Sequence, residues 1–191
     1  MIFEIVLVLL LSYFLGSIPS GVIFAKIFNL EDLRTIGSGN TGTTNVLRTG
    51  NYTAAALTLI FDFSKACLAI YLTILFNDDL IFISGLVILI GHIFPVWLRF
   101  KGGKGFASYL GIISMVNIYL FLLISLIWLI VFFYKKVSSL AALFSCLSCI
   151  LFSIVIFKSN VMLVIVLTII IILTHRENIK RLIGGNETEI K

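Results

Sequence analysis

Long apolar runs separated by short polar segments constrain the fold of this chain more than any other feature. Hydrophobic residues make up 60% of its 191 residues and charged residues only 12%. Inside a bilayer every backbone N–H and C=O group has to be hydrogen-bonded within the protein, which favours helices. The sequence therefore predicts an all-α integral membrane protein in which residues 1–191 form a single polytopic domain.

Seven apolar segments are candidates for transmembrane helices. They cover about residues 2–28, 52–76, 80–98, 106–115, 118–134, 138–157 and 161–174. Gly16, Pro19 and Gly21 interrupt the first segment. The fourth is short because residues 106–134 as one helix would be about 43 Å long, well beyond a hydrocarbon core of ~30 Å. Ser114 and Asn117 mark the expected break.

The distribution of positive charge predicts the orientation in the membrane. With seven crossings and the N-terminus outside, every Lys and Arg falls on the cytoplasmic side except Lys158 and Lys65, which lies in the second span. A five-span arrangement would export Lys135 and Lys136, so the positive-inside rule favours seven. The C-terminus and three polar, glycine-rich segments are then cytoplasmic.

The first polar segment, residues 37–48, is rich in Gly, Thr and Asn and ends at Arg48. Its glycines permit turns with positive φ and close approach of the backbone. Its hydroxyl and amide groups can bond phosphate oxygens, and Arg48 adds a forked cation. Solvated loops often have a similar composition, so this segment alone is weak evidence for a site.

The second polar segment, residues 91–105, contains Gly91-His92 and then Lys101-Gly102-Gly103-Lys104-Gly105. Successive backbone N–H groups before a helix, with lysines beside them, favour binding of an anion. The spacing is not that of a Walker A loop. The positive-inside rule would explain the lysines but not the glycines. His92, at the end of a span, is expected to be structural.

The third polar segment, residues 175–187, begins where the last span reaches the cytoplasm. His175 and Asn178 are three residues apart and so share a helix face. The alternative is a basic amphipathic tail on anionic lipid, which would account for Arg176, Lys180 and Arg181.

Two further pairs of residues lie within spans. Asp62 and Lys65 stand three residues apart in the second span, where unpaired charges are costly, so we expect a structural ion pair and, as a second choice, a role in substrate binding. Cys146 and Cys149 have a C-x-x-C spacing, but no second ligand pair accompanies them. We interpret both as small buried apolar side chains and expect no metal site.

These segments, in this order, closely resemble the bacterial acyl-phosphate:glycerol-3-phosphate acyltransferases, the PlsY family. The matching runs are residues 16–21, 37–48, 91–105 and 175–187, and the resemblance spans nearly the whole chain. Thr43, Ala66 and Ser108 stand where the family usually has Ala, Gly and Thr. None of these differences removes an essential charged or hydrogen-bonding group.

The resemblance implies transfer of an acyl group from acyl phosphate to glycerol 3-phosphate, giving lysophosphatidic acid and phosphate, the committed step of bacterial phospholipid biosynthesis. It implies a multi-pass protein of the bacterial inner membrane with its active site facing the cytoplasm and with no cofactor. The expected partners are the two substrates and membrane lipid, without nucleic acid. The enzyme that forms the acyl phosphate is a candidate partner.

The candidate site residues fall into three groups. We assign catalysis to Ser38, Arg48, Lys104, His175 and Asn178. We assign substrate or phosphate binding to Gly37, Gly39, Asn40, Thr44, Asn45, Lys101, Gly102, Gly103, Gly105 and Ser139. We assign structural roles to Asp62, Lys65 and Glu187. The general base is left open between a substrate phosphate oxygen, which we favour, and His175.

The sequence also bears on two other classes of protein. CoA- and carrier-protein-dependent acyltransferases carry an H-x-x-x-x-D pair, which is absent here because Trp97 follows His92 by five residues and Lys180 follows His175 by five. A small membrane transporter of a phosphorylated solute is the alternative function. It would require polar residues at mid-membrane and often internal repeats, whereas here only Asp62 and Lys65 lie deep.

Overall fold

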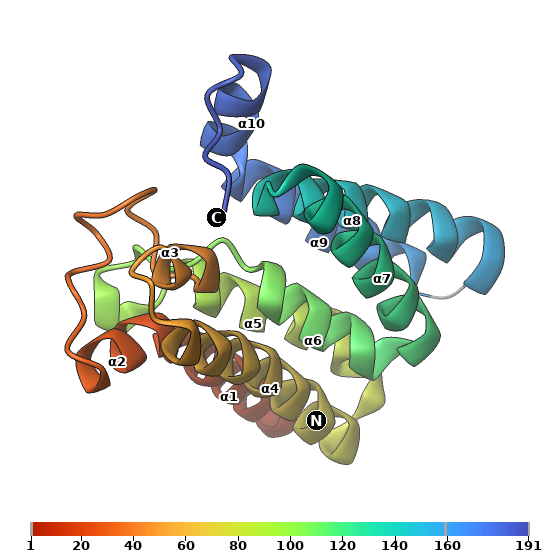
Figure 1. Ribbon diagram of the computed structural model, residues 1–191. Helices are drawn as coiled ribbons and strands as arrows, with labels where there is room; N and C mark the ends of the chain where they lie inside the picture. The colour runs from red at the N-terminus through yellow and green to blue at the C-terminus, as the bar shows by residue number, and fades with distance from the viewer. Residues whose placement is uncertain (1, 159, 191) are drawn as a thin grey trace. The chain divides into compact units, whose positions relative to one another are not determined.

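The computed structural model describes residues 2–158 and 160–190, which form helices and loops without any strand (Figure 1). The all-α class predicted from the apolar runs is therefore confirmed. The chain divides into two compact units, of which unit 1 ends at Met115 and unit 2 begins at Val116. Unit 1 runs from red to green in Figure 1 and unit 2 from teal to blue.

Unit 1 is a helical bundle in which α1, α4 and α5 pack against one another. Its elements are α1 (Ile2–Ser17), α2 (Ser20–Ile27), α3 (Thr43–Leu47), α4 (Tyr52–Phe76), η1 (Asp78–Leu80), α5 (Ile81–Ile93), η2 (Val96–Leu98) and α6 (Phe106–Val116). A Cβ atom on Gly16 would collide with the carbonyl oxygen of Ile88, and one on Gly91 would meet the backbone N–H nitrogen of Ser17 at 3.1 Å. Glycine at these two positions therefore lets the backbones of α1 and α5 touch.

Unit 2 is built around α8, which packs against α7 and α9. Its elements are α7 (Ile118–Lys135), α8 (Ser138–Phe152), η3 (Ser153–Phe157), α9 (Val161–Thr174) and α10 (Arg176–Ile183). Cys146 and Cys149 are buried thiols within α8, as predicted.

Five helical stretches in the described residues are long and apolar enough to cross a membrane. They are Ile2–Ile27, Tyr52–Phe76, Asp78–Leu98, Ile118–Lys135 and Ser138–Phe157. A sixth is possible by composition if Val161–Thr174 and Arg176–Ile183, which are bent by 63°, form one broken span. Phe106–Val116 is a shorter apolar helix. Each predicted segment is thus helical, and the number of seven crossings stays a prediction.

The predicted helix breaks are explained by single residues. Pro19 has no N–H to donate and disfavours helical geometry in the residue before it, so α1 ends at Ser17 and α2 begins at Ser20. Asn117 separates α6 from α7, and its side chain accepts a hydrogen bond from the N–H of Leu120 (2.9 Å). This N-cap satisfies a backbone group that the start of a helix leaves unpaired.

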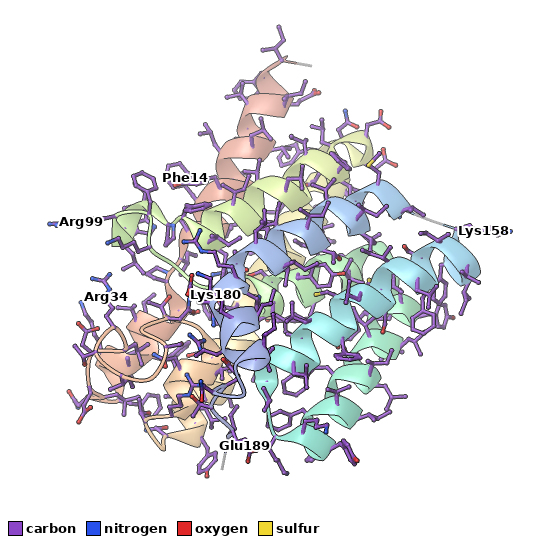
Figure 2. All side chains as sticks on the ribbon, turned by 90° about the horizontal axis from the view of Figure 1, so that it is seen from above. Phe14, Arg34, Arg99, Lys158, Lys180 and Glu189 are labelled. Carbon is purple, nitrogen blue, oxygen red and sulfur yellow. The ribbon has the colours of Figure 1, made fainter. Side chains whose placement is uncertain are left out.

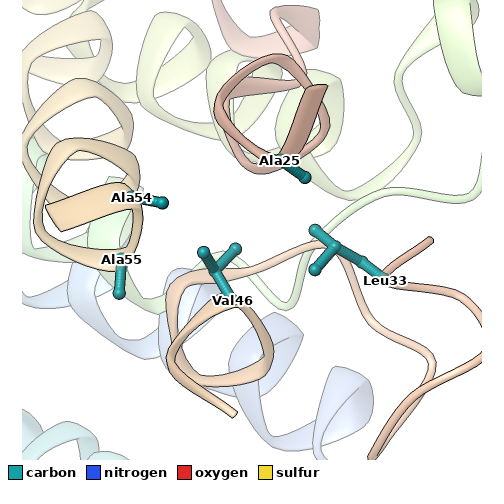
Figure 3. Packing of buried hydrophobic residues seen from close by; sticks show 5 residues of the cluster. All are labelled: Ala25, Leu33, Val46, Ala54 and Ala55. Atoms are coloured by element: carbon teal, nitrogen blue, oxygen red, sulfur yellow. The ribbon is translucent and has the colours of Figure 1, made fainter. Parts of the chain in front are cut away.

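A small apolar cluster fixes the long segment between α2 and α4 (Figure 3). Leu33 and Val46 from this segment pack against Ala25 of α2 and against Ala54 and Ala55 of α4. Leu33 is 2% exposed and Val46 is 0% exposed. The first glycine-rich segment is therefore attached to the helices at both of its ends and does not rely on its polar residues alone.

Candidate active site

The first polar segment folds around the side chain of Asn45, which is only 1% exposed. Its Oδ1 accepts a hydrogen bond from the N–H of Ser38 (3.1 Å). Its Nδ2 donates to the carbonyl oxygens of Leu33 (2.7 Å) and Ile36 (3.2 Å). The amide group of Asn45 thus holds the loop in shape, and the contact with substrate that we assigned to it stays a prediction.

Arg48 lies half-buried against this same loop, with its NH1 nitrogen 3.5 Å from Oδ1 of Asn45. Gly37 has a φ of 51°. A Cβ atom there would collide with the Asn45 side chain and approach the Cδ atom of Arg48 to 2.8 Å. Glycine at position 37 is therefore needed both for the backbone conformation and to make room for Arg48. Ser38 and Gly39 are exposed beside it.

Asn40 connects the first and second polar segments. Its Oδ1 accepts a hydrogen bond from the N–H of Gly42 (3.0 Å), which tightens its own loop. Its Nδ2 donates to the carbonyl oxygen of Gly102 (3.4 Å). Two segments that are far apart in sequence are therefore neighbours within unit 1. Thr44, at the start of α3, is half-buried in the first segment.

The second polar segment packs its glycines against the end of α5. The N–H groups of Gly102 and Gly103 donate to the carbonyl oxygens of Ile93 (2.9 Å) and His92 (3.1 Å), respectively. A Cβ atom on Gly102 would collide with the carbonyl oxygen of His92, and one on Gly103 would collide with Nε2 of the His92 ring. A side chain at either position would therefore displace the loop.

The cations of the second segment precede a helix. Lys101 is exposed and Lys104 is half-buried. Gly105 has a φ of 92°, and its carbonyl oxygen accepts a hydrogen bond from the N–H of Tyr109 (2.7 Å) in the first turn of α6. The N-terminus of a helix carries a partial positive charge, so the lysines and the helix together favour an anion.

Exposed arginines add to the positive charge of both segments. Arg34, just before the first segment, and Arg99, just before the second glycine run, point outward from unit 1 (Figure 2). Charges of one sign around a site raise the local concentration of oppositely charged ligands. Unit 1 is thus suited to attract an anionic substrate.

A buried polar cluster centred on the carboxylate of Asp62 also lies in unit 1. Asp62 accepts a hydrogen bond from Oγ of Ser20 (2.6 Å) and forms an ion pair with Nζ of Lys65 (2.6 Å). Lys65 also donates to the carbonyl oxygen of Ile18 (2.8 Å), at the break between α1 and α2. Nδ1 of His92 lies 3.4 Å from Oδ1 of Asp62. The predicted ion pair is therefore present, and it also satisfies backbone exposed by the Pro19 break.

A small, partly open pocket borders this cluster. Its lining residues come from the α1–α2 break, the first loop, α4, the end of α5 and the second loop: Ser17, Ile18, Pro19, Ser20, Gly21, Thr41, Asp62, Lys65, His92, Pro95, Leu98, Gly102 and Gly103. Oγ of Ser17 is buried and makes no hydrogen bond with the described residues. Sequence reasoning missed Ser17, Ser20 and the central place of His92. The Gly- and Ser-rich run around Pro19 was the available signal.

In unit 2 the third polar segment turns back at Gly185, where φ is 69°, and buries the side chain of Glu187. Oε1 of Glu187 accepts hydrogen bonds from Oγ of Ser139 (2.9 Å) and Nδ2 of Asn178 (2.6 Å), and Oε2 accepts from Nε of Arg181 (2.6 Å). Burial raises the pKa of Glu187. The hydrogen bonds from Asn178, Arg181 and Ser139, together with the charge of Arg181, lower it by more than burial raises it, so the pKa lies below its usual value.

His175, at the start of this third segment, and Asn178, one turn later in α10, are both buried, at 4% and 3% exposed. Nδ1 of His175 lies 2.8 Å from the carbonyl oxygen of Ile171. A carbonyl can only accept, so Nδ1 carries a proton, and Nε2 is the acceptor nitrogen whenever the ring is neutral. Oδ1 of Asn178 is buried and accepts no hydrogen bond from the described residues, which makes it available to a hydroxyl donor.

Two residues of unit 2 have partners that the sequence did not indicate. Ser139, which we assigned to substrate binding, donates to Glu187. Arg181, for which a lipid-facing role was the alternative, is bound to the same carboxylate. An acid two residues after Gly184-Gly185 was the available signal, because a glycine turn can bring it back onto the helix before it. These contacts show where Glu187 lies, and the structural role that we assigned to it stays a prediction.

Fold and site together define a polytopic helical membrane protein whose glycine-rich cationic loops can bind an anion. A family model described as glycerol-3-phosphate acyltransferase matches residues 6–185. The chain belongs to this family and is an acyltransferase.

Known glycerol-3-phosphate acyltransferases are similar in sequence to this chain along nearly their whole lengths. A glycerol-3-phosphate acyltransferase from Pelagibacter ubique is 47% identical over 189 residues, covering 98% of both chains. One from Wolbachia pipientis is 43% identical over 184 residues, covering 95% of this chain and 96% of the relative. The alternative of a solute transporter is therefore not favoured.

Solved structures agree as well. The crystal structure of PlsY (YgiH), an integral membrane glycerol 3-phosphate acyltransferase, in its glycerol 3-phosphate form is 34% identical, with a TM-score of 0.91 over 98% of this chain and 96% of that chain. The lysophosphatidic acid form is 33% identical, with a TM-score of 0.89 over 98% and 95%. The resemblance inferred from the sequence motifs is thus confirmed.

Proposed function

We propose that this enzyme transfers the acyl group of an acyl phosphate to glycerol 3-phosphate and releases lysophosphatidic acid and inorganic phosphate. The observation that most supports it is the hydrogen bond from Asn40 to Gly102, which joins two cationic glycine-rich loops within unit 1. The names of the relatives and of the two similar crystal structures support the acceptor and the lipid product. The absence of an H-x-x-x-x-D pair from the sequence supports acyl phosphate as the donor.

The reaction needs little covalent chemistry from the protein because the acyl phosphate is already activated. The glycerol hydroxyl oxygen attacks the acyl carbon, the bond from that carbon to the phosphate oxygen breaks, and the phosphate leaves with the bonding electrons. The main task is to hold two phosphates close together despite their repulsion. Arg48 and Lys104 supply the positive charge that this requires and that stabilises the leaving group.

Residues of unit 2 serve the same reaction through His175 and Asn178. Oδ1 of Asn178 is a buried acceptor and therefore suits a glycerol hydroxyl. One amide hydrogen of Asn178 is bound to Glu187, and the second can donate to a phosphate oxygen. The hydroxyl proton goes either to a substrate phosphate oxygen or to Nε2 of His175. We favour the phosphate oxygen, because it travels with the substrate and needs no added base.

The membrane arrangement is also part of the proposal. Seven crossings with the N-terminus outside put the C-terminus and all three polar segments on the cytoplasmic face of the bacterial inner membrane. Residues 1–191 then act as one catalytic domain. The enzyme that makes the acyl phosphate is the expected source of the donor, since an activated acyl group has to reach this site intact.

The proposal is tested with purified protein and radiolabelled glycerol 3-phosphate, comparing acyl phosphate, acyl-CoA and acylated carrier protein as donors. Labelled lysophosphatidic acid is expected from acyl phosphate alone. Robust turnover from acyl-CoA, with none from acyl phosphate, would contradict it.

A further inference from the structure

His92 is not used by the proposed reaction, yet its ring contacts both the buried ion pair and the second glycine-rich loop. It lies one residue before the end of α5 and is 8% exposed. One edge of the ring faces Asp62 and Ser108, and the other faces Gly103. From this position the ring can hold the second loop in a fixed place relative to the helices of unit 1.

Hydrogen bonds fix the orientation of the ring. Oγ of Ser108 lies 3.2 Å from the carbonyl oxygen of Asp62 and 3.2 Å from Nδ1 of His92. The hydroxyl has one proton, and a carbonyl can only accept, so Ser108 donates to the backbone carbonyl of Asp62 and accepts a hydrogen bond from the Nδ1–H of His92. The same N–H faces Oδ1 of Asp62 at 3.4 Å. A flipped ring would lose both contacts.

The opposite edge of the ring supports the loop. A Cβ atom on Gly103 would overlap Nε2 of His92 and would lie 2.9 Å from Cε1 and 3.0 Å from Cδ2. The N–H of Gly103 also donates to the carbonyl oxygen of His92 (3.1 Å). The Gly102 carbonyl in turn accepts from Asn40 of the first loop (3.4 Å). The ring therefore contacts the loop at the point where the two cationic segments join.

The support behind His92 is itself firmly held. The Asp62 carboxylate is bound by Ser20 and Lys65, both at 2.6 Å, and Lys65 is bound to the Ile18 carbonyl oxygen at 2.8 Å. Asp62 and Lys65 are 2% and 4% exposed. Buried charges that are fully paired and hydrogen-bonded form rigid networks. The ion pair thus fixes the α1–α2 break and the His92 ring together.

We propose that His92 is a positioning residue: held by Asp62 and Ser108, its ring sets the position of the Gly102–Gly103 backbone and so of the adjoining Lys101 and Lys104. This inference rests on the proposed function, because it assumes that the second loop binds a substrate phosphate. A displacement of about 1 Å can cost about a hundredfold in rate. Removing the ring should therefore weaken substrate use even in protein that remains folded.

The test is a double-mutant cycle on the purified full-length enzyme, with KM for both substrates, kcat and melting temperature measured for each variant. His92→Asn keeps a polar group near Ser108 and Asp62 but removes Cε1 and Nε2. We expect it to raise KM for at least one phosphorylated substrate about tenfold or more. Gly103→Ala should do so too, because its Cβ meets the ring. When His92→Asn is already present, adding Gly103→Ala should raise KM much less, because the ring atoms that the Cβ would meet are gone.

Ser84→Ala is the matched control. Ser84 is buried in the same helix, where its hydroxyl is hydrogen-bonded to Ser12 (2.8 Å) and Thr73 (2.7 Å), both of which lie in other helices and not in the loop. It should lower the melting temperature and leave both KM values unchanged. Should Gly103→Ala fail to purify, recovery of folded protein in the double variant reports the same contact.

The outcomes separate the two proposals. Relief of the Gly103→Ala defect by His92→Asn, with KM changes absent from Ser84→Ala, supports the positioning role. The positioning role would be overturned if the increases in KM from the two single substitutions simply multiply in the double variant. It would also be overturned if His92→Asn lowers the melting temperature and leaves both KM values unchanged. A wild-type enzyme that makes no lysophosphatidic acid from acyl phosphate would contradict the proposed function instead.

Discussion

Arg48 is the only Lys or Arg in residues 37–48, and Gly37 and Asn45 hold its side chain against the loop. A lysine cannot reproduce the forked pair of hydrogen bonds that a guanidinium gives a phosphate. Losing one charge-assisted contact should cost about 1.5–3 kcal/mol, or roughly ten- to a hundredfold in rate. We expect Arg48→Lys to lose most acyl-transfer activity in steady-state assays while inserting and purifying normally.

The kinetics identify the role of Arg48. A residue that binds the phosphate of the ground state raises KM for glycerol 3-phosphate, whereas one that stabilises the leaving group lowers kcat. Lys180→Ala is the matched control, because its side chain is 73% exposed. It should stay near wild type. Full activity in Arg48→Lys together with a loss in Lys180→Ala would show that the site is wrongly placed.

Glu187 gives the protein a pH-dependent contribution to stability. Because its pKa is lowered in the folded state, its contribution is fully present above the usual value of 4.5 and is lost as the pH falls through the lower folded value. Glu187→Gln keeps a hydrogen-bond acceptor for Ser139 and Asn178 but loses the charged bond to Arg181. We expect the variant to melt earlier at pH 7, by an amount that corresponds to about 1.5–3 kcal/mol.

Melting curves of the purified protein across pH check this. The difference between wild type and Glu187→Gln should be constant from neutral pH down to about pH 5 and should shrink below it, because the wild-type carboxylate becomes protonated. Glu177→Gln is the control, since that carboxylate is 58% exposed and its ion pairs are at the surface. A difference that does not change with pH would mean that the charge on Glu187 contributes nothing.

At the scale of the elements, much of the structure could be predicted from the sequence. Runs of apolar residues define helices because the bilayer leaves the backbone no other partner. Pro19 and Asn117 locate two breaks for local reasons, a missing donor and an N-cap. These features depend on neighbouring residues, and the structure places the helices close to the predicted bounds.

The contacts that shape the site could not be predicted in the same way. Ser20 and Asp62 are 42 residues apart, and Lys65 and Ile18 are 47 apart. A pattern of residue types does not say which buried polar groups meet, because that depends on how helices rotate and pack. The sequence therefore indicated which segments carry chemistry, but not that Asn45 binds its own loop or that His92 supports Gly103.

The orientation of the elements in the membrane is a separate prediction, tested by labelling single cysteines in a cysteine-free background. All four chosen positions are exposed, so access depends on the side of the membrane: Gly50, Asp78, Lys136 and Glu189. In intact cells an impermeant thiol reagent should modify Asp78→Cys and leave Gly50→Cys, Lys136→Cys and Glu189→Cys unmodified. Labelling at residue 136 from outside would favour a five-span arrangement.

At the scale of the whole molecule, the protein combines an apolar helical body with polar loops that carry its net positive charge. Its net charge is +5, and 60% of its residues are hydrophobic. A lipid-like acyl donor can be reached from the bilayer, and a charged acceptor can be drawn from the aqueous side by exposed cations. The body and the loops therefore suit the two substrates of a single interfacial reaction.

The central claim is that the chain's own residues handle both phosphates in a direct acyl transfer. The most direct measurement is to incubate purified enzyme with acyl phosphate and glycerol 3-phosphate in excess chelator, and to quantify lysophosphatidic acid and inorganic phosphate together. One phosphate should be released for each lysophosphatidic acid formed, at a rate that the chelator does not change. Phosphate release without lipid product, or turnover that requires an added divalent metal, would contradict the account.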